Sequence, residues 1–135
     1  MKMNNPIFKT LAVAAAVLLA VVTTSGKPAK KAITKKGNTV IVNTTHVVKG
    51  VRGYASATPL KIYLTYGKIT NVEALPNQET PSVFDRAEKL LQKYVGKSVD
   101  EAQKMQVDAV SGATYSSKAL IKTMRGGLKY YSDNK

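Results

Sequence analysis

The sequence has 135 residues, a length typical of one domain, and carries 21 Lys and Arg against 8 Asp and Glu, for a net charge of +13. It has no cysteine, which excludes disulfides, thiolate metal sites and a cysteine nucleophile, and its single histidine, His46, excludes a multi-histidine metal site. The basic residues are spread along the chain and are densest between Lys27 and Lys36. We interpret that group as a solvated spacer and expect no nucleic-acid partner.

The first 26 residues have the pattern of an export signal. Lys2 and Lys9 precede an unbroken apolar run over residues 11–22, and Thr, Ser and Gly follow it. A basic start, an apolar core of about 7–15 residues and small residues after it describe a secretory signal, whereas a membrane span needs about 20 apolar residues. We expect residues 1–26 to be a signal peptide or an uncleaved membrane anchor, and residues 27–38 to be a basic linker.

The next part of the chain has the patterns of β-strands. Residues 39–48 are rich in β-branched side chains, and residues 59–65 alternate between apolar and polar, which predicts a strand with one buried face. Residues 66–68 form a tight connection to a return strand over residues 69–75. These segments predict a small antiparallel sheet.

The period of the apolar residues then changes from two to between three and four, which is typical of amphipathic helices. Ser-x-x-acid patterns resembling capping boxes stand at Ser82 with Asp85 and at Ser98 with Glu101. The expected elements are helices over residues 81–95, 99–105 and 117–131, with a brief strand over residues 107–110. Strands followed by helices predict an α+β domain over residues 39–135, in which helices cover the sheet and the signal or anchor segment precedes it.

The stretch over residues 108–117, DAVSGATYSS, concentrates more possible chemistry than any other part of the chain. Gly112 permits a tight turn, Ala113 leaves the next position uncrowded, and Thr114 falls just before the last predicted helix. Helix N-termini favour phosphate because they present free N–H groups and a partial positive charge. Hydroxyls before a helix are also how ordinary N-caps look, so a phosphate site and a simple cap both remain open from the residues alone.

Asp-x-x-Ser-Gly-Ala-Thr followed by Tyr-Ser-Ser closely resembles the flavinylation motif of the FMN-binding domain family, which occurs in the flavin subunits of the Rnf and Nqr redox complexes. The resemblance implies that Thr114 carries FMN through a phosphoester bond, which a dedicated flavin transferase makes from FAD with a magnesium ion. It extends over roughly residues 50–128, through Gly53–Tyr54, the hairpin, and a Glu79–Thr80 pair similar to one that the family places near the flavin.

The candidate cofactor-binding residues follow from these matches and from the hydroxyls beside Thr114; we assign no catalytic residue and no metal ligand. They are Thr114, Ser111, Gly112, Ala113, Asp108, Ser116, Ser117, Glu79, Thr80 and Tyr54. Tyr63, Tyr66 and Tyr115 are, with Tyr54, further candidates for stacking on the flavin ring, although half-buried packing is the commoner role of such residues.

The resemblance implies an electron carrier more than a stand-alone enzyme. We expect it to act in the periplasm or at the extracytoplasmic face of the cytoplasmic membrane, with membrane or extracytoplasmic redox proteins as partners and a flavin transferase for maturation. The alternative is a basic extracytoplasmic binding module without a redox cofactor, in which the hydroxyl cluster only caps a helix.

Overall fold

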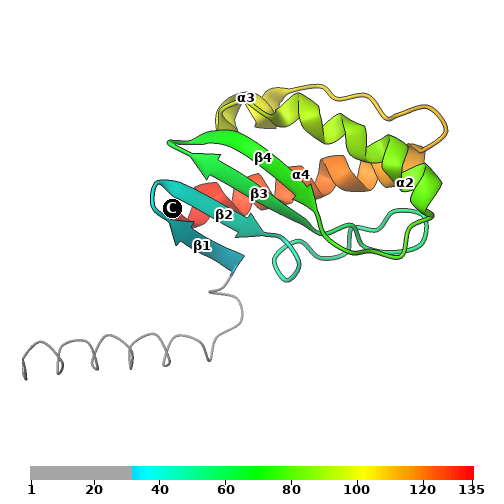
Figure 1. The fold of residues 1–135 in the computed structure, drawn as a ribbon, viewed down its shortest axis with the longest axis horizontal. Helices are drawn as coiled ribbons and strands as arrows, with labels where there is room; N and C mark the ends of the chain where they lie inside the picture. The colour runs from blue at the N-terminus through cyan, green and yellow to red at the C-terminus, as the bar shows by residue number, and fades with distance from the viewer. Residues whose placement is uncertain (1–31) are drawn as a thin grey trace, which may run out of the picture. The chain divides into compact units, whose positions relative to one another are not determined.

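The computed structural model describes residues 32–135, which form one compact unit. Four strands come first, and the helices follow them in the chain (Figure 1). The strands are β1 (Ile33–Lys36), β2 (Thr39–Asn43), β3 (Leu60–Thr65) and β4 (Lys68–Ala74). The helices are α2 (Pro81–Glu88), the 3₁₀ helix η2 (Lys89–Tyr94), α3 (Val99–Lys104) and α4 (Thr114–Asn134).

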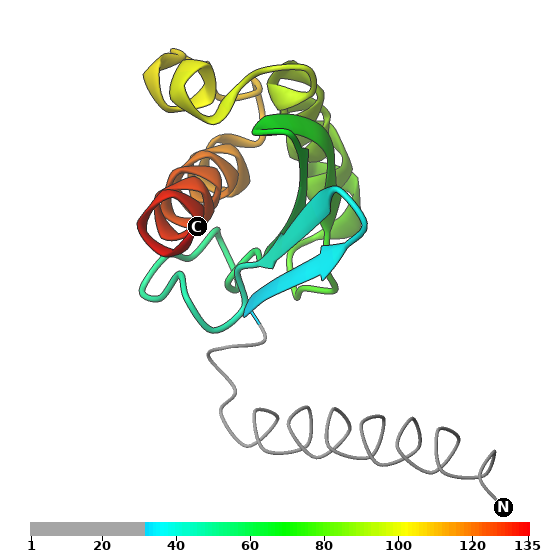
Figure 2. The same cartoon turned by 90° about the vertical axis from the view of Figure 1, so that its left-hand side faces the viewer.

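The strands form one antiparallel sheet in the order β1-β2-β3-β4. Helix α4 contacts β2 and β3, η2 contacts β4, and α2 lies against α4. Figure 2 shows α4 on the concave side of the curved sheet. The predicted α+β class, with an antiparallel sheet covered by helices, is therefore confirmed.

The central hairpin follows from its sequence pattern. Leu60, Ile62 and Leu64 of β3 are fully buried, while the side chains between them are half-buried. The turn to β4 consists of Tyr66 (φ 51°) and Gly67 (φ 76°), and two positive φ angles are what a two-residue hairpin turn of type I′ requires.

The predicted linker over residues 27–38 is wrong for residues 33–36, which form strand β1 paired with β2. Gly37 (φ 59°) turns the chain back, and the pairing supplies partners that the lysine-rich sequence does not reveal. The strand predicted over residues 39–48 ends early, at Asn43. The side-chain oxygen of Asn43 accepts a hydrogen bond from the N–H of Thr45 at 3.0 Å, and this local bond takes the place of a hydrogen bond between strands.

Helices α2 and α3 begin where predicted, at residues 81 and 99, but the predicted helix over residues 81–95 divides into α2 and η2, and α3 ends one residue early, at Lys104. The capping box predicted at Ser82 and Asp85 is wrong, because Thr80 is the N-cap and Pro81 opens α2, a position that suits a residue without an N–H. The box predicted at Ser98 and Glu101 is confirmed, with both reciprocal bonds present.

The strand predicted over residues 107–110 is wrong, because this segment has no paired strand and the N–H of Val110 donates instead to the hydroxyl of Ser117, at 2.9 Å. Helix α4 begins at Thr114, three residues before its predicted start. Within residues 32–135 no helix is both long and apolar enough to span a membrane. The predicted signal or anchor over residues 1–26 lies outside the described residues.

Helix α4 lies close to the sheet because small residues face it. A Cβ at Gly127 would stand 2.7 Å from Cδ1 of Ile62 and 2.8 Å from Cγ2 of Thr44. Leu120, Met124 and Leu128 of the same helix are fully buried in the core. This close packing fixes the axis of α4, and therefore the position of its first turn.

The two Ser-x-x-acid patterns provide a matched test of capping. Ser98→Ala removes a hydroxyl that accepts the N–H of Glu101, so we expect a loss of about 1 kcal/mol in the free energy of unfolding. Ser82→Ala, at an exposed position of α2 whose hydroxyl makes no cap, should change it by less than about 0.5 kcal/mol. Urea titration of both variants measures the difference, and equal losses would contradict the assignment.

Candidate functional site

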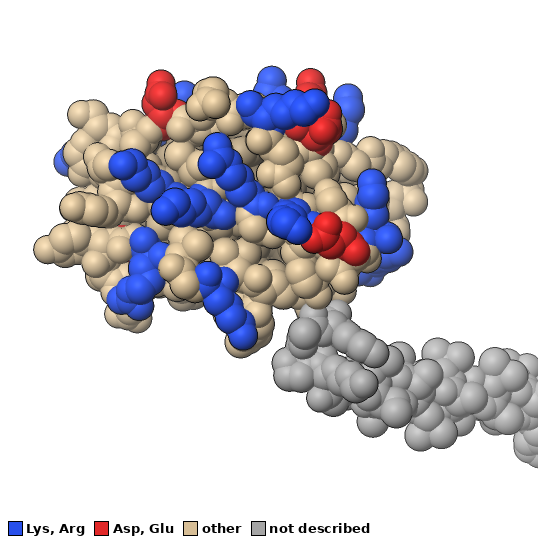
Figure 3. All heavy atoms as spheres, turned by 180° about the vertical axis from the view of Figure 1, so that it is seen from behind, with Lys and Arg blue, Asp and Glu red and all other residues tan. Residues whose placement is uncertain are grey.

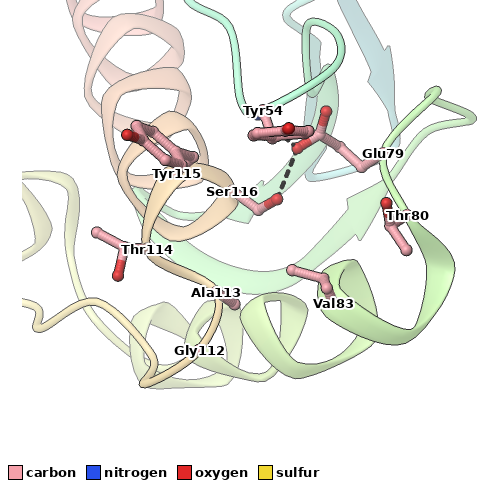
Figure 4. Close-up of a pocket in the computed structure, with 9 residues that line it drawn as sticks. All are labelled: Tyr54, Glu79, Thr80, Val83, Gly112, Ala113, Thr114, Tyr115 and Ser116. Atoms are coloured by element: carbon pink, nitrogen blue, oxygen red, sulfur yellow. Dashed lines mark hydrogen bonds between the residues drawn. The ribbon is translucent and has the colours of Figure 1, made fainter.

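A hollow of about 270 Å³ opens where α2 and α4 begin (Figure 4). Three segments far apart in the sequence meet there: the loop after Gly53, the start of α2, and the first turn of α4. The lining residues are Tyr54, Glu79, Thr80, Val83, Gly112, Ala113, Thr114, Tyr115 and Ser116. The structure thus brings most of the predicted site residues into one place.

The first turn of α4 has no side-chain cap. Its N-cap is Ala113, which has no oxygen to offer, and Thr114 is the first helical residue, with an exposed side chain. The turn before it is made by Gly112, whose φ of 79° favours glycine. Thr80, the N-cap of α2, also makes no side-chain cap bond. Two helix N-termini therefore face the hollow without an intramolecular cap, a setting that attracts anions.

Glu79 connects the three segments that form the site, and we call its carboxylate with the hydrogen-bond donors around it the clamp. Its side chain is 5% exposed, and its carboxylate accepts the N–H groups of Tyr54 at 2.9 Å, Ala55 at 2.6 Å and Ser56 at 2.7 Å. The hydroxyl of Ser116 donates to the same carboxylate at 2.6 Å. One buried side chain thereby joins the loop, the start of α2 and the first turn of α4.

The carboxylate of Glu79 is held in its charged form. Burial raises its pKa, but the hydrogen bonds from Ser116 and from the three backbone N–H groups outweigh burial and keep the pKa below its usual value. The loop approaches this carboxylate so closely that a Cβ at Gly53 would lie 2.8 Å from Cδ of Glu79. A glycine at position 53 is therefore a requirement of the clamp.

Two tyrosines stand exposed at the hollow. Tyr54 is 78% exposed and Tyr115 is 67% exposed, and their ring centroids are 6.0 Å apart with planes inclined at 47°. Exposed aromatic rings at a hollow mark a binding surface. The other stacking candidates lie elsewhere: Tyr63 donates its hydroxyl to Glu73 on the polar side of the hairpin, and Tyr66 lies in the β3–β4 turn.

Three of the predicted site residues do not line the hollow. Asp108 and Ser111 are exposed in the segment that precedes α4. Ser117 is fully buried and accepts the N–H of Val110, so it fixes the turn. Figure 4 shows the neighbouring Ser116 turned toward Glu79, and Thr114 on the outer side of the helix.

Sequence reasoning missed two neighbours of the site. Val83 lines the hollow from α2, as the first turn of an amphipathic helix could have suggested. The guanidinium of Arg86 lies beside the turn, since a Cβ at Gly112 would stand 2.8 Å from its Nη1. No pattern in the sequence indicates that Arg86 and Gly112 meet, because 26 positions separate them.

Glu79→Gln tests the clamp. It replaces an acceptor oxygen by a donor facing backbone N–H groups, so we expect a loss of about 2 kcal/mol in the free energy of unfolding at neutral pH. Glu73→Gln, at an exposed carboxylate, should cost less than about 0.5 kcal/mol. Denaturation at pH 7 measures both, and a Glu79 variant as stable as the Glu73 variant would contradict the clamp.

The stabilising effect of the Glu79 carboxylate should also depend on pH. Because the folded pKa of Glu79 is below its unfolded value, the carboxylate stabilises the fold fully above about pH 5.5, and that contribution is lost as the pH falls through the folded pKa. The stability gap between the wild-type protein and Glu79→Gln should therefore shrink below about pH 4. A gap that widens in acid would reverse the assigned direction.

A sequence model of the FMN-binding domain matches residues 53–129, more than half of the chain. No curated protein matches the sequence. The matched span contains all the residues that line the hollow, from Tyr54 to Ser116. FMN is therefore supported as the cofactor, and the chain belongs to the FMN-binding domain family.

Proposed function

We propose that this domain carries FMN covalently, through a phosphoester to the hydroxyl of Thr114, and serves as an electron carrier outside the cytoplasmic membrane. One observation carries the proposal. Thr114 is an exposed hydroxyl on the first residue of an uncapped helix, at the edge of a hollow with two exposed aromatic rings. Attachment through the phosphate requires a hydroxyl, a helix N-terminus favours the phosphate charge, and the aromatic rings offer a surface for the flavin ring.

The residues present fit both ends of FMN. The phosphate would lie at the uncapped start of α4, where the helix dipole and the guanidinium of Arg86 offset negative charge. The ring system would lie against Tyr54 and Tyr115. The hollow of about 270 Å³ is near the lower limit of about 300 Å³ for small-molecule sites, so one edge of the ring would stay accessible.

The attachment is a group transfer with balanced products. The oxygen of Thr114 forms a bond to the FMN phosphorus of FAD, the pyrophosphate bond breaks, and AMP leaves; the hydroxyl proton goes to a base of the transferase. The exposed position of Thr114 leaves room for that enzyme. Asp108 and Ser111, which are exposed outside the hollow, would then be contacts for the transferase rather than for the ring.

Bound FMN supplies electron transfer in one-electron and two-electron steps, and the chain supplies tethering and orientation. Glu79 accepts hydrogen bonds from the N–H of Tyr54 and from the hydroxyl of Ser116, and so connects the loop of Tyr54 to the helix turn that carries the attachment point. A covalent link suits the predicted export, because a protein outside the cytoplasm cannot draw on a pool of free FMN. Membrane-bound or extracytoplasmic redox proteins would be the partners.

The alternative is a basic binding module in which the hydroxyl cluster serves as a helix cap. Ala113 occupies the N-cap, and neither Thr114 nor Ser111 caps α4. Ser116 and Ser117 make bonds within the fold instead. A capping role therefore does not account for the exposed hydroxyl of Thr114, and attachment of FMN does.

Co-expression with a flavin transferase tests the proposal. We expect the denatured protein to fluoresce in a gel and its mass to rise by one FMN less one water, with peptide fragmentation placing the addition on Thr114. Thr114→Ala should abolish the addition because it removes the oxygen that forms the ester, and Thr114→Ser should retain it. A colourless wild-type protein of unmodified mass, despite an active transferase, would overturn the proposal.

A further inference from the structure

The outer side of α4 carries a row of basic side chains. Lys118, Lys122, Arg125 and Lys129 follow one another at spacings of four, three and four residues, which places them on one side of a helix. All four are exposed. Figure 3, which shows this side of the molecule, has Lys and Arg side chains running across its middle. We call these four residues the α4 basic row.

The charge of the α4 basic row is little offset. Asp133, the only acidic residue of α4, pairs with Lys129 at 2.8 Å. Lys49 approaches from the loop after β2 and lines a shallow groove together with Lys122 and Lys129. By contrast, α2 and α3 each have two acidic residues and one basic residue: Asp85 and Glu88 with Arg86, and Asp100 and Glu101 with Lys104.

The α4 basic row begins at the candidate cofactor site. Lys118 lies four residues after Thr114, about 6 Å along the helix axis, and the row extends about 17 Å from there to Lys129 at a rise of about 1.5 Å per residue. The exposed rings of Tyr54 and Tyr115 stand at its beginning. Row and rings fit within the roughly 800 Å² that one partner contributes to a standard interface.

We propose that the α4 basic row is the docking surface for an acidic electron-transfer protein, with Tyr54 and Tyr115 at the end of the interface nearest the cofactor. This inference rests on the proposed function, because it assigns the partner of the same site. A row of one sign of charge steers an oppositely charged protein and raises its association rate. Tyrosine is also enriched in protein interfaces relative to the rest of the surface.

An anionic membrane is the competing partner, and the apolar residues argue against it. A helix that lies on a membrane carries Trp, Phe or Leu on the side it inserts. Among residues 32–135 the exposed large apolar side chains are Tyr54, Tyr66, Val95 and Tyr115, and none lies along α4 beyond its first turn. The α4 basic row therefore has charge without an insertable apolar surface.

Two double charge reversals change the net charge equally but at different places on the surface. Comparing them shows whether binding depends on the position of the charges or only on their total. Lys122→Glu with Arg125→Glu alters the α4 basic row, and Lys89→Glu with Lys93→Glu alters exposed positions on η2. The first pair should leave α4 folded, because each new carboxylate stands four residues from a remaining lysine of the row, Lys118 or Lys129, and such pairs are favourable on a helix. Thermal melts check this, and Lys122→Gln with Arg125→Gln is a milder second variant.

The probe is a small acidic [2Fe–2S] ferredoxin, immobilised and titrated with flavin-free full-length protein at low and high salt. We expect the α4 variant to bind about tenfold more weakly than the η2 variant at about 20 mM salt, with the Gln variant between them. The difference in binding between the two variants should vanish near 0.5 M salt, because the screening length there is only about 4 Å and long-range electrostatic steering is lost. Equal binding by the two reversals, or no salt-sensitive binding, would overturn the proposal.

Two further arms separate the alternatives. If vesicles containing phosphatidylglycerol bind the wild-type protein and the α4 reversal alone abolishes that binding, while ferredoxin binding is unchanged, the surface belongs to a membrane and the proposal fails. Electron transfer from reduced ferredoxin to flavin-loaded protein should slow by the same factor as binding. Because the binding arm needs no flavin, absence of FMN would contradict the proposed function and leave the docking result readable.

Discussion

The site depends on one buried carboxylate. Glu79 accepts four hydrogen bonds, three from consecutive backbone N–H groups and one from Ser116, and these partners hold it charged in a nearly water-free position. A buried charge is tolerated only with such donors. The charge in turn helps to order the loop, which a bond from the N–H of Gly53 to the carbonyl of Ser56 at 2.7 Å also holds. The loop of Tyr54 has no regular secondary structure, so Glu79 converts it into a fixed wall of the hollow. The same carboxylate connects the backbone of Tyr54 to the first turn of α4, which carries Tyr115.

The N-termini of α3 and α4 differ in their side-chain caps, and this difference favours an anionic ligand at α4. Helix α3, only six residues long, has a complete capping box at Ser98 and Glu101. Helix α4, the longest within residues 32–135, begins after an alanine and lacks a side-chain cap, which contributes about 1 kcal/mol where present. Tight packing against the sheet at Gly127 holds α4 in place without that cap. Its first-turn N–H groups therefore stay available for an anion, as the proposed attachment of a phosphate to Thr114 requires.

Sequence patterns predicted several features that depend on neighbours in the chain, although the capping box at Ser82 and Asp85 was wrong. The alternation in β3 and the capping box at Ser98 are local, and both were confirmed. Strand β1 was missed because its lysines show no apolar side, and only pairing with β2 makes it a strand. The resemblance to the FMN-binding domain family identified Glu79 and Tyr54 as site residues. The spacing of apolar residues could not show that the guanidinium of Arg86 lies beside Gly112. Such contacts depend on how α2 packs against α4, which is a tertiary property.

Helix α4 combines three roles that its geometry keeps separate. Its first turn carries Thr114, its inner side places Leu120 and Met124 in the core, and its outer side carries Lys122 and neighbouring charges. A helix allows this because residues three to four positions apart share one side. Surface charge can therefore change without disturbing the core or the proposed attachment hydroxyl of Thr114. The net charge of +13 by itself pointed to no particular partner, but four of its basic residues share the side of α4 that leads to the candidate site, and α4 has one acidic residue, Asp133.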